Sequence, residues 1–153
     1  MTAMDARRRF LLFLAGALLS GPGFAAAPPK KKAPAPKPET KTRVVIQVSD
    51  SDSKRWNLAL TTAKTLQSEY GEEKIDVAIV ALGAGVNMLK DDADVSNRVQ
   101  SAIARKIFII ACHSSMSALN VTEDNLGRNI FVVPSGAAEI VKRQRDGWIY
   151  LRP

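Results

Sequence analysis

The sequence has little of the residues that usually carry redox and metal chemistry. Its 153 residues include one cysteine and one histidine. A single cysteine excludes an internal disulfide, a C-x-x-C redox pair and a cysteine-rich zinc site. With one histidine, a metal site would have to be built mostly from carboxylates. The sequence therefore predicts neither a metal centre nor a cofactor.

The positive charge of the chain lies mostly outside its candidate domain. The whole sequence has 22 basic and 15 acidic residues, a net charge of +7 that would ordinarily raise nucleic acid or an anionic membrane as partners. Residues 1–42 hold eight of the basic and two of the acidic residues, so residues 43–153 carry only +1. Because a nucleic-acid-binding domain keeps its basic stripe on the fold itself, we expect no nucleic-acid partner. The remaining length allows one domain.

The first 25 residues have the three-part order of an export signal. Arginines at 7–9 precede an apolar run at 10–19, and Gly23-Phe24-Ala25 then offers small residues at the two places that a cleavage site requires. The apolar run is shorter than the roughly 20 residues that a membrane-spanning helix needs. The run R-R-R-F-L also resembles the twin-arginine export pattern. We therefore expect a signal peptide over residues 1–25, a mature N-terminus at Ala26 and a periplasmic location. An uncleaved, membrane-tethered form is the alternative.

Residues 26–42 have the composition of a linker. This stretch holds five prolines and five lysines and offers almost nothing apolar to bury, which favours an extended, solvated conformation. A spacer left after export is the favoured interpretation. Peripheral association of the basic linker with an anionic membrane surface is the second.

From residue 43 onward, the pattern alternates between strands and helices. Apolar runs rich in β-branched residues predict five short strands, at residues 44–48, 75–82, 107–111, 130–133 and 148–151. Apolar residues at three- and four-residue steps predict helices at 53–70, around 95–103 and at 135–146. Such alternation predicts an α/β fold, a three-layer α/β/α sandwich with a mainly parallel sheet of about five strands. Its ligand crevice is expected at the carboxyl ends of the strands.

Acidic residues and glycines follow the first two predicted strands. Asp50 and Asp52 resemble the paired acids of aspartyl-phosphate hydrolases, but turn and helix-cap roles are favoured for them. Gly83 and Gly85 begin like the G-x-G-x-x-G dinucleotide fingerprint, but Met88 occupies the place of the third glycine. We therefore expect the two glycines to form a tight turn over the crevice.

The only thiol, Cys112, follows the third predicted strand. We expect it at the edge of the crevice and at the start of a short helix, a setting that lowers the pKa of a thiol. Tyrosine phosphatase chemistry is excluded because it needs an arginine six residues on, where this chain has Ala118. His113 need not face Cys112, since adjacent residues on an extended chain point opposite ways. A capping or surface role is favoured for that histidine. The local sequence leaves two roles for Cys112 equally open, a reactive nucleophile and a small buried hydrophobe.

Several separated stretches of the chain together resemble the DsrE/DsrF-like family. They are V-V-I-Q-V-S-D at 44–50, R-W-N-L-A at 55–59, I-V-A-L-G-A-G-V-N-M-L at 79–89, Ala111-Cys112 with Met116, V-P-S-G at 133–136, Ile140, Arg143-Gln144 and 147–153. The resemblance implies a small three-layer α/β fold that usually assembles into homo-oligomers. Some members of the family have a cysteine that carries persulfide sulfur between proteins, and the resemblance implies that this chain could have one too. Only Cys112 can fill that role here.

The leading hypothesis is a periplasmic sulfur-handling protein in which the Cys112 thiolate accepts sulfane sulfur and passes it to an acceptor thiol. The donor and the acceptor are unidentified. The alternative is a non-catalytic oligomeric protein that binds a small ligand, and a third hypothesis is a magnesium-dependent hydrolase using Asp50 and Asp52. The candidate catalytic residue is Cys112, and the candidate binding residues are Gly83, Gly85, Asn87, Asn57, His113 and Ser114.

Overall fold

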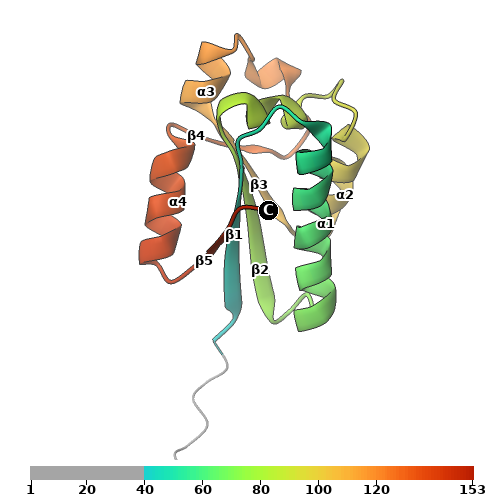
Figure 1. Ribbon diagram of the computed structural model, residues 1–153, viewed down its shortest axis with the longest axis vertical. Helices are drawn as coiled ribbons and strands as arrows, with labels where there is room; N and C mark the ends of the chain where they lie inside the picture. Colours follow the sequence, from blue (N-terminus) through green and yellow to red (C-terminus); the bar gives the residue numbers. More distant parts are fainter. Residues whose placement is uncertain (1–39) are drawn as a thin grey trace, which may run out of the picture. The chain divides into compact units, whose positions relative to one another are not determined.

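The computed structural model of the protein describes residues 40–153 (Figure 1). The predicted signal peptide and most of the predicted linker lie outside the described residues. The strands are β1 (Thr42–Val48), β2 (Ile75–Ala81), β3 (Phe108–Cys112), β4 (Phe131–Val133) and β5 (Ile149–Leu151). The α-helices are α1 (Ser53–Tyr70), α2 (Ser96–Ala104), α3 (His113–Ala118) and α4 (Gly136–Arg145), and two 3-10 helices are η1 (Gly83–Leu89) and η2 (Glu123–Asn125). Within residues 40–153, no helix is long and apolar enough to cross a membrane.

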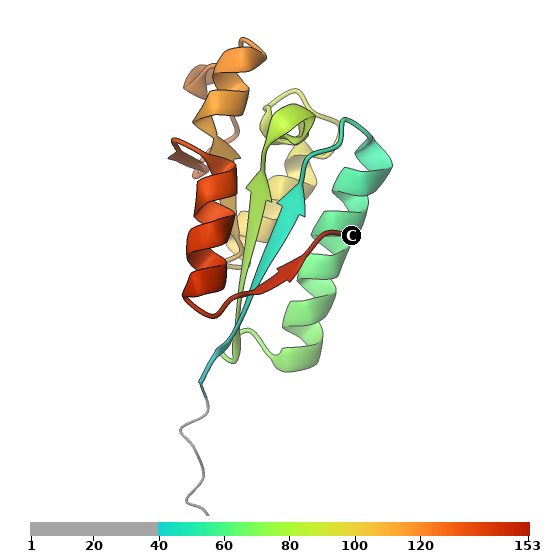
Figure 2. The same cartoon turned by 60° about the vertical axis from the view of Figure 1, so that its left-hand side comes forward.

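The five strands form one sheet in the order β4-β3-β2-β1-β5, and every neighbouring pair is parallel. The steps from β1 to β4 all run in one direction across the sheet, whereas the connection from β4 to β5 returns to the opposite edge. Right-handed crossovers place helices on opposite faces when the direction reverses. Accordingly, α1 and α2 cover one face and α4 covers the other (Figure 2). The predicted three-layer α/β fold with five strands is thereby confirmed.

The boundaries of the longest helix, α1, follow from local sequence signals. Asp52 caps its first turn, because its side chain accepts a hydrogen bond from the backbone N–H of Lys54 at 2.9 Å. Gly71 ends the helix with a φ of 89°, a conformation that glycine adopts without strain. The residues that α1 buries recur at steps of three and four, as the sequence predicts: Trp56, Ala59, Leu60, Ala63 and Gln67.

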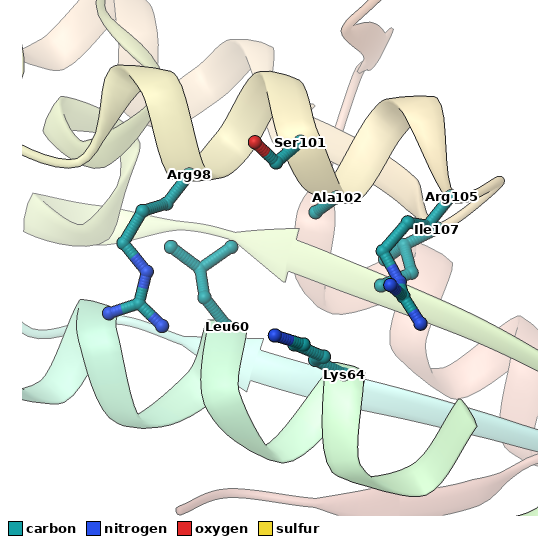
Figure 3. Close-up of a pocket in the computed structure, with 7 residues that line it drawn as sticks. All are labelled: Leu60, Lys64, Arg98, Ser101, Ala102, Arg105 and Ile107. Carbon is teal, nitrogen blue, oxygen red and sulfur yellow. The ribbon is translucent and has the colours of Figure 1, made fainter. Parts of the chain in front are cut away.

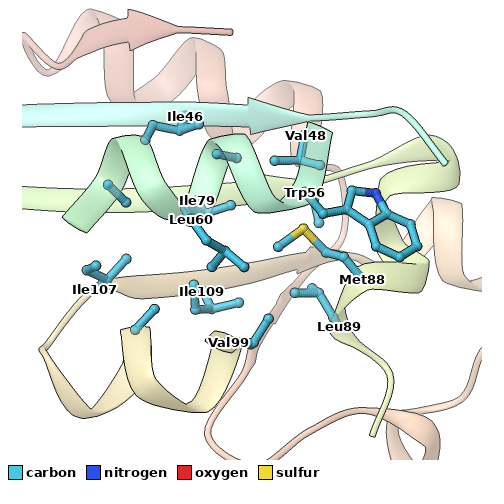
Figure 4. Packing of buried hydrophobic residues seen from close by; sticks show 14 of the residues in the cluster. Ile46, Val48, Trp56, Leu60, Ile79, Met88, Leu89, Val99, Ile107 and Ile109 are labelled. Atoms are coloured by element: carbon cyan, nitrogen blue, oxygen red, sulfur yellow. The ribbon is translucent and has the colours of Figure 1, made fainter. Parts of the chain in front are cut away.

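The larger part of the core lies between the sheet and the layer formed by α1 and α2 (Figure 4). There Ile46, Ile79 and Ile109, from the three central strands, are each fully buried. A smaller cluster packs under α4, where Ile140 meets residues of the opposite sheet face. From Val77 to Ala81, β2 is buried on both faces, and this stretch is therefore continuously apolar and not alternating.

Candidate functional site

Cys112 lies where the carboxyl end of β3 meets the beginning of α3. It is the last residue of the strand and the N-cap of the helix, and 5% of its surface is exposed. Its strand neighbour is Val133, the last residue of β4. The chain then turns through Ser135, whose hydroxyl accepts a hydrogen bond from Ala138 and caps α4. The beginnings of two helices therefore meet at the cysteine.

Gly136, the first residue of α4, packs directly against Cys112. A Cβ atom at position 136 would lie 3.0 Å from the Cβ of Cys112 and 3.2 Å from the Cβ of Leu82. Both distances are shorter than ordinary van der Waals contact. The absence of a side chain at position 136 lets the first turn of α4 approach the cysteine, so that its backbone N–H can hydrogen-bond to the sulfur.

Opposing influences set the pKa of the Cys112 thiol, and the lowering ones prevail. Burial is the largest single influence and raises the pKa. Hydrogen bonds lower it, first from the hydroxyl of Ser115, then from the backbone N–H groups of Gly136, Ser115 and Ser114. Their sum outweighs burial, so the pKa lies below the ordinary value of a thiol. The site therefore favours the thiolate, although it is almost closed to solvent.

The hydroxyl of Ser115 is held by a second contact. The backbone N–H of Gly83 donates to its Oγ at 2.7 Å. A hydroxyl has one hydrogen to donate and can accept at the same oxygen. Because Gly83 supplies the accepted hydrogen bond, the hydroxyl hydrogen of Ser115 is free to point at the sulfur of Cys112. Gly83, a predicted binding residue, thus acts on the thiol through Ser115.

Ser114 links α3 to the segment that precedes α4. Its hydroxyl donates to the carbonyl oxygen of Pro134 at 2.7 Å, and its backbone N–H reaches the same oxygen at 3.3 Å. This double contact fixes α3 relative to the end of β4. The same backbone N–H is shared with the sulfur of Cys112, whereas the hydroxyl of Ser114 bonds to Pro134 alone.

Three other predicted binding residues have contacts away from the thiol. Asn57 lies between α1 and α2, where it donates to the carbonyl of Ser53 and accepts from Arg98. Asn87 bonds to the carbonyl of Ala84 within η1 at 3.2 Å. Gly85 is buried, and its contacts are with the end of β1. The structure therefore brings Gly83 and Ser114 to Cys112, but gives these three residues other neighbours.

His113 begins α3 and is exposed. It lines a hollow of about 440 Å³ together with residues from the end of α3 to η2, among them Met116, Asn120 and Val121. Cys112 does not line this hollow. The histidine is therefore placed beside a surface depression next to the cysteine site, and it does not hydrogen-bond to the sulfur.

Two residues of the site, Ser115 and Gly136, were not among the sequence candidates. Ser115 stands three residues after Cys112, at the third position of a helix that Cys112 caps. A side chain at that position reaches back toward the cap, so the spacing C-x-x-S carried a usable signal. For Gly136, the sequence gives no signal that points to the thiol, because the proximity of Gly136 to Cys112 depends on how α4 packs against the sheet.

The acidic residues after β1 have structural partners. Asp52 caps α1, as the sequence predicts, and the side chain of Asp50 lies 3.7 Å from Arg152. Across residues 40–153, no group of three or more histidine, cysteine, aspartate or glutamate side chains could hold a metal ion. The described residues therefore offer no site of that size for the magnesium that the hydrolase hypothesis requires.

Two proteins of unknown function are among the solved structures that resemble this chain. A protein of unknown function from Methanobacterium thermoautotrophicum is 31% identical, with a TM-score of 0.71, and the match covers 74% of this chain and 100% of that one. A conserved protein of unknown function from Bacteroides thetaiotaomicron is 19% identical, with a TM-score of 0.59, over 72% of this chain and 94% of that one. At 19% identity, the second likeness shows the fold alone.

A comparison with curated proteins gave no match. The sequence model of the DsrE/DsrF-like family, however, matches residues 42–153, which is nearly the whole described part of the chain. This match confirms the resemblance inferred from the separated stretches between residues 44 and 153. The chain belongs to the DsrE/DsrF-like family.

Proposed function

We propose that this protein is a sulfur carrier in which Cys112 holds sulfane sulfur as a persulfide. The observation that supports this most directly is the group of four hydrogen-bond donors around the sulfur, which lower its pKa despite burial. Nucleophilic transfer requires a thiolate, and a lowered pKa raises the fraction of thiolate that is present at a given pH. Membership of the DsrE/DsrF-like family is consistent with such a role.

The transfer consists of two displacements that balance without any external oxidant. The Cys112 thiolate attacks the terminal sulfur of a donor persulfide, which forms Cys112–S–SH and releases the donor thiolate. An acceptor thiolate then attacks the same terminal sulfur, which restores the Cys112 thiolate and leaves the acceptor as a persulfide. The sulfane sulfur keeps its oxidation state throughout. The donors from Ser115 and Gly136 stabilise the negative charge on the Cys112 sulfur before the first displacement and after the second.

The absence of a second cysteine suits a carrier. A neighbouring thiol would attack the inner sulfur of the persulfide and discharge it as a disulfide. Cys112 is the only cysteine of the 153 residues, so no such resolving group exists within the chain. Transfer of the carried sulfur to a thiol therefore requires a thiol of another molecule.

The intact mass of the exported protein tests this proposal. After incubation with polysulfide, we expect a gain of one sulfur atom that a reductant removes and that the variant Cys112→Ser lacks. The same spectrum reports the N-terminus, which we propose begins near Ala26 after export to the periplasm. A chain of unchanged mass would contradict the carrier, and an intact Met1 on membrane-bound protein would contradict cleavage.

A second candidate function, binding of a small ligand without catalysis, is favoured by one observation. Only 5% of the surface of Cys112 is exposed, so a donor must displace neighbouring atoms before it meets the sulfur. If native Cys112 resists both sulfur loading and alkylation at every accessible pH, the binding protein becomes the better account.

We also propose that the protein forms homo-oligomers. Phe108 and Phe131 are 39% and 58% exposed, and their ring centroids lie 6.4 Å apart at the β4 edge of the sheet. Exposed apolar clusters of this kind mark protein interfaces more often than isolated residues do. We expect sedimentation of the mature protein to give a multiple of the monomer mass, and Phe131→Arg to reduce it.

Leu58→Arg is the matched control, because Leu58 is 45% exposed on α1. It should leave the sedimenting mass unchanged. A monomer at all micromolar concentrations would contradict the proposal, and dissociation by Leu58→Arg alone would place the interface on α1 instead.

A further inference from the structure

A groove of about 240 Å³ lies between α1 and α2, on the face of the sheet opposite α4 (Figure 3). Its floor is apolar and is formed by Leu60, Ala102 and Ile107, each of them at most 6% exposed. Three of the seven lining residues are cationic and none is anionic. The groove therefore combines an apolar floor with a positive rim.

Arg98 is held in place at this rim without being neutralised. It extends from α2 toward α1, where its guanidinium donates to the side-chain oxygen of Asn57 and to the hydroxyl of Thr61, the latter at 2.9 Å. Both acceptors are uncharged. The two hydrogen bonds fix the orientation of the arginine, but neither acceptor carries a negative charge that would neutralise it.

Of the other two cations, only Arg105 has a carboxylate partner. Arg105 lies 3.3 Å from Glu72 and also hydrogen-bonds to Gln67 at 3.3 Å. Lys64, from α1, has no hydrogen bond or ion pair through its ammonium group within residues 40–153. Three positive charges with one negative partner leave a local charge of +2. Like charges gathered in this way repel, and a bound anion would relieve the repulsion.

We propose that this groove binds a small organic dianion with a short apolar body, such as a linear dicarboxylate. Arg98 and Arg105 are seven residues apart, or about two helical turns, so they stand at opposite ends of the groove with the apolar floor between them. In Figure 3, Lys64 reaches from α1 toward Leu60. A ligand with a carboxylate at each end would meet both cationic ends and cover the floor.

The size of the groove limits the ligand. Pockets for drug-sized molecules typically measure about 300–1,000 Å³, whereas this groove measures about 240 Å³. A short chain fits it better than a nucleotide or a peptide does. An inorganic anion would engage the cations but would leave Leu60 and Ala102 uncovered. This site is separate from Cys112, which lies at the end of β3 and faces α4.

Titration of the mature chain, labelled with ¹⁵N, with adipate at constant ionic strength tests the proposal. We expect saturable shifts of the amide signals of Leu60, Ser101 and Ala102. Hexanoate lacks the second carboxylate and inorganic phosphate lacks the apolar body, so each should bind about tenfold more weakly. Phosphate binding as tight as that of adipate would overturn the role of the apolar floor.

A pair of variants tests the cationic rim. Lys64→Gln should weaken adipate binding by about tenfold, because it removes one of the three positive charges that line the groove. Lys142→Gln is the matched control, since Lys142 lies on α4 and pairs with Asp146. Equal weakening by both variants would mean non-specific charge attraction. The proposal would also fail if adipate gave no saturable shift.

Discussion

Replacing Gly85 with alanine is expected to lower the free energy of unfolding by about 3 kcal/mol, near the upper end of typical overpacking costs. A Cβ atom at position 85 would lie 2.3 Å from the carbonyl oxygen of Val48 and 2.7 Å from its carbonyl carbon. Both atoms belong to the backbone at the end of β1, so no side-chain rotation can relieve the overlap. Either η1 or the end of β1 must move. Chemical denaturation of the two proteins measures the difference.

Gly127→Ala is the matched control for this substitution. The nearest atom to a Cβ at position 127 is the side-chain amide nitrogen of Gln100, at 2.7 Å. That atom is the far end of a flexible side chain and donates to the carbonyl oxygen of Arg128 at 3.2 Å, so moving it away costs at most one exposed hydrogen bond. We expect this variant to lose less than about 1 kcal/mol. Equal losses from both variants would mean that the contact of Gly85 with β1 does not decide stability.

The same substitution should also affect the cysteine site. η1 begins at Gly83, whose N–H donates to the hydroxyl of Ser115, and Gly85 fixes η1 against β1. A displaced η1 would weaken that hydrogen bond. Sulfur loading of Gly85→Ala, measured under conditions where the variant remains folded, should therefore be slower than in the unaltered protein.

The parts of the fold that the sequence predicts depend on local signals. The strands β1 and β2 read as apolar runs, and α1 shows its cap at Asp52 and its end at Gly71 within the sequence itself. The order of the strands in the sheet comes from the structure, whereas their parallel pairing follows from their alternation with helices. The position of Cys112 follows for the same reason, because the carboxyl end of a strand and the next helix are adjacent in the chain.

The surroundings of Cys112 depend on contacts that local sequence does not contain. Gly136 lies 24 residues further along the chain, and it reaches the thiol only because α4 crosses the sheet to join β4 with β5. Asn57 illustrates the opposite case, since it follows the first strand closely in sequence but faces Arg98 on α2. Packing decides which neighbour each face of a helix meets. A short polar side chain such as that of Asn57 gives little indication of that neighbour in the sequence.

Ser115→Ala is expected to raise the pKa of Cys112 and to slow its alkylation at pH 7 by about three- to tenfold. The hydroxyl of Ser115 is the strongest of the hydrogen-bond influences that lower this pKa. Its loss leaves the backbone donors of Gly136, Ser115 and Ser114 in place, so the thiolate is weakened but not abolished. Part of the effect is offset because a thiolate of higher pKa is the better nucleophile.

The control for this variant is Ser114→Ala, which removes a hydroxyl from the same turn. The hydroxyl of Ser114 bonds to the carbonyl of Pro134, and only the backbone N–H of Ser114 reaches the sulfur. Alkylation of Ser114→Ala should therefore keep the pH midpoint of the unaltered protein. If both variants shift the midpoint equally, the geometry of α3 and not the Ser115 hydroxyl governs the thiol.

The same hydrogen bonds predict how stability depends on pH. Because folding lowers the pKa of Cys112, its contribution to stability is fully present above the pKa of the unfolded thiol, about 8.5. It is lost as the pH falls through the pKa of the folded state. Between the two values, the free energy of unfolding should rise with pH by up to about 1.4 kcal/mol per pH unit. Ser115→Ala should narrow this window and Cys112→Ser should remove it. Denaturation curves with the same slope against pH in all three proteins would mean that the fold does not stabilise the thiolate, and the sulfur carrier would then lose its main physical support.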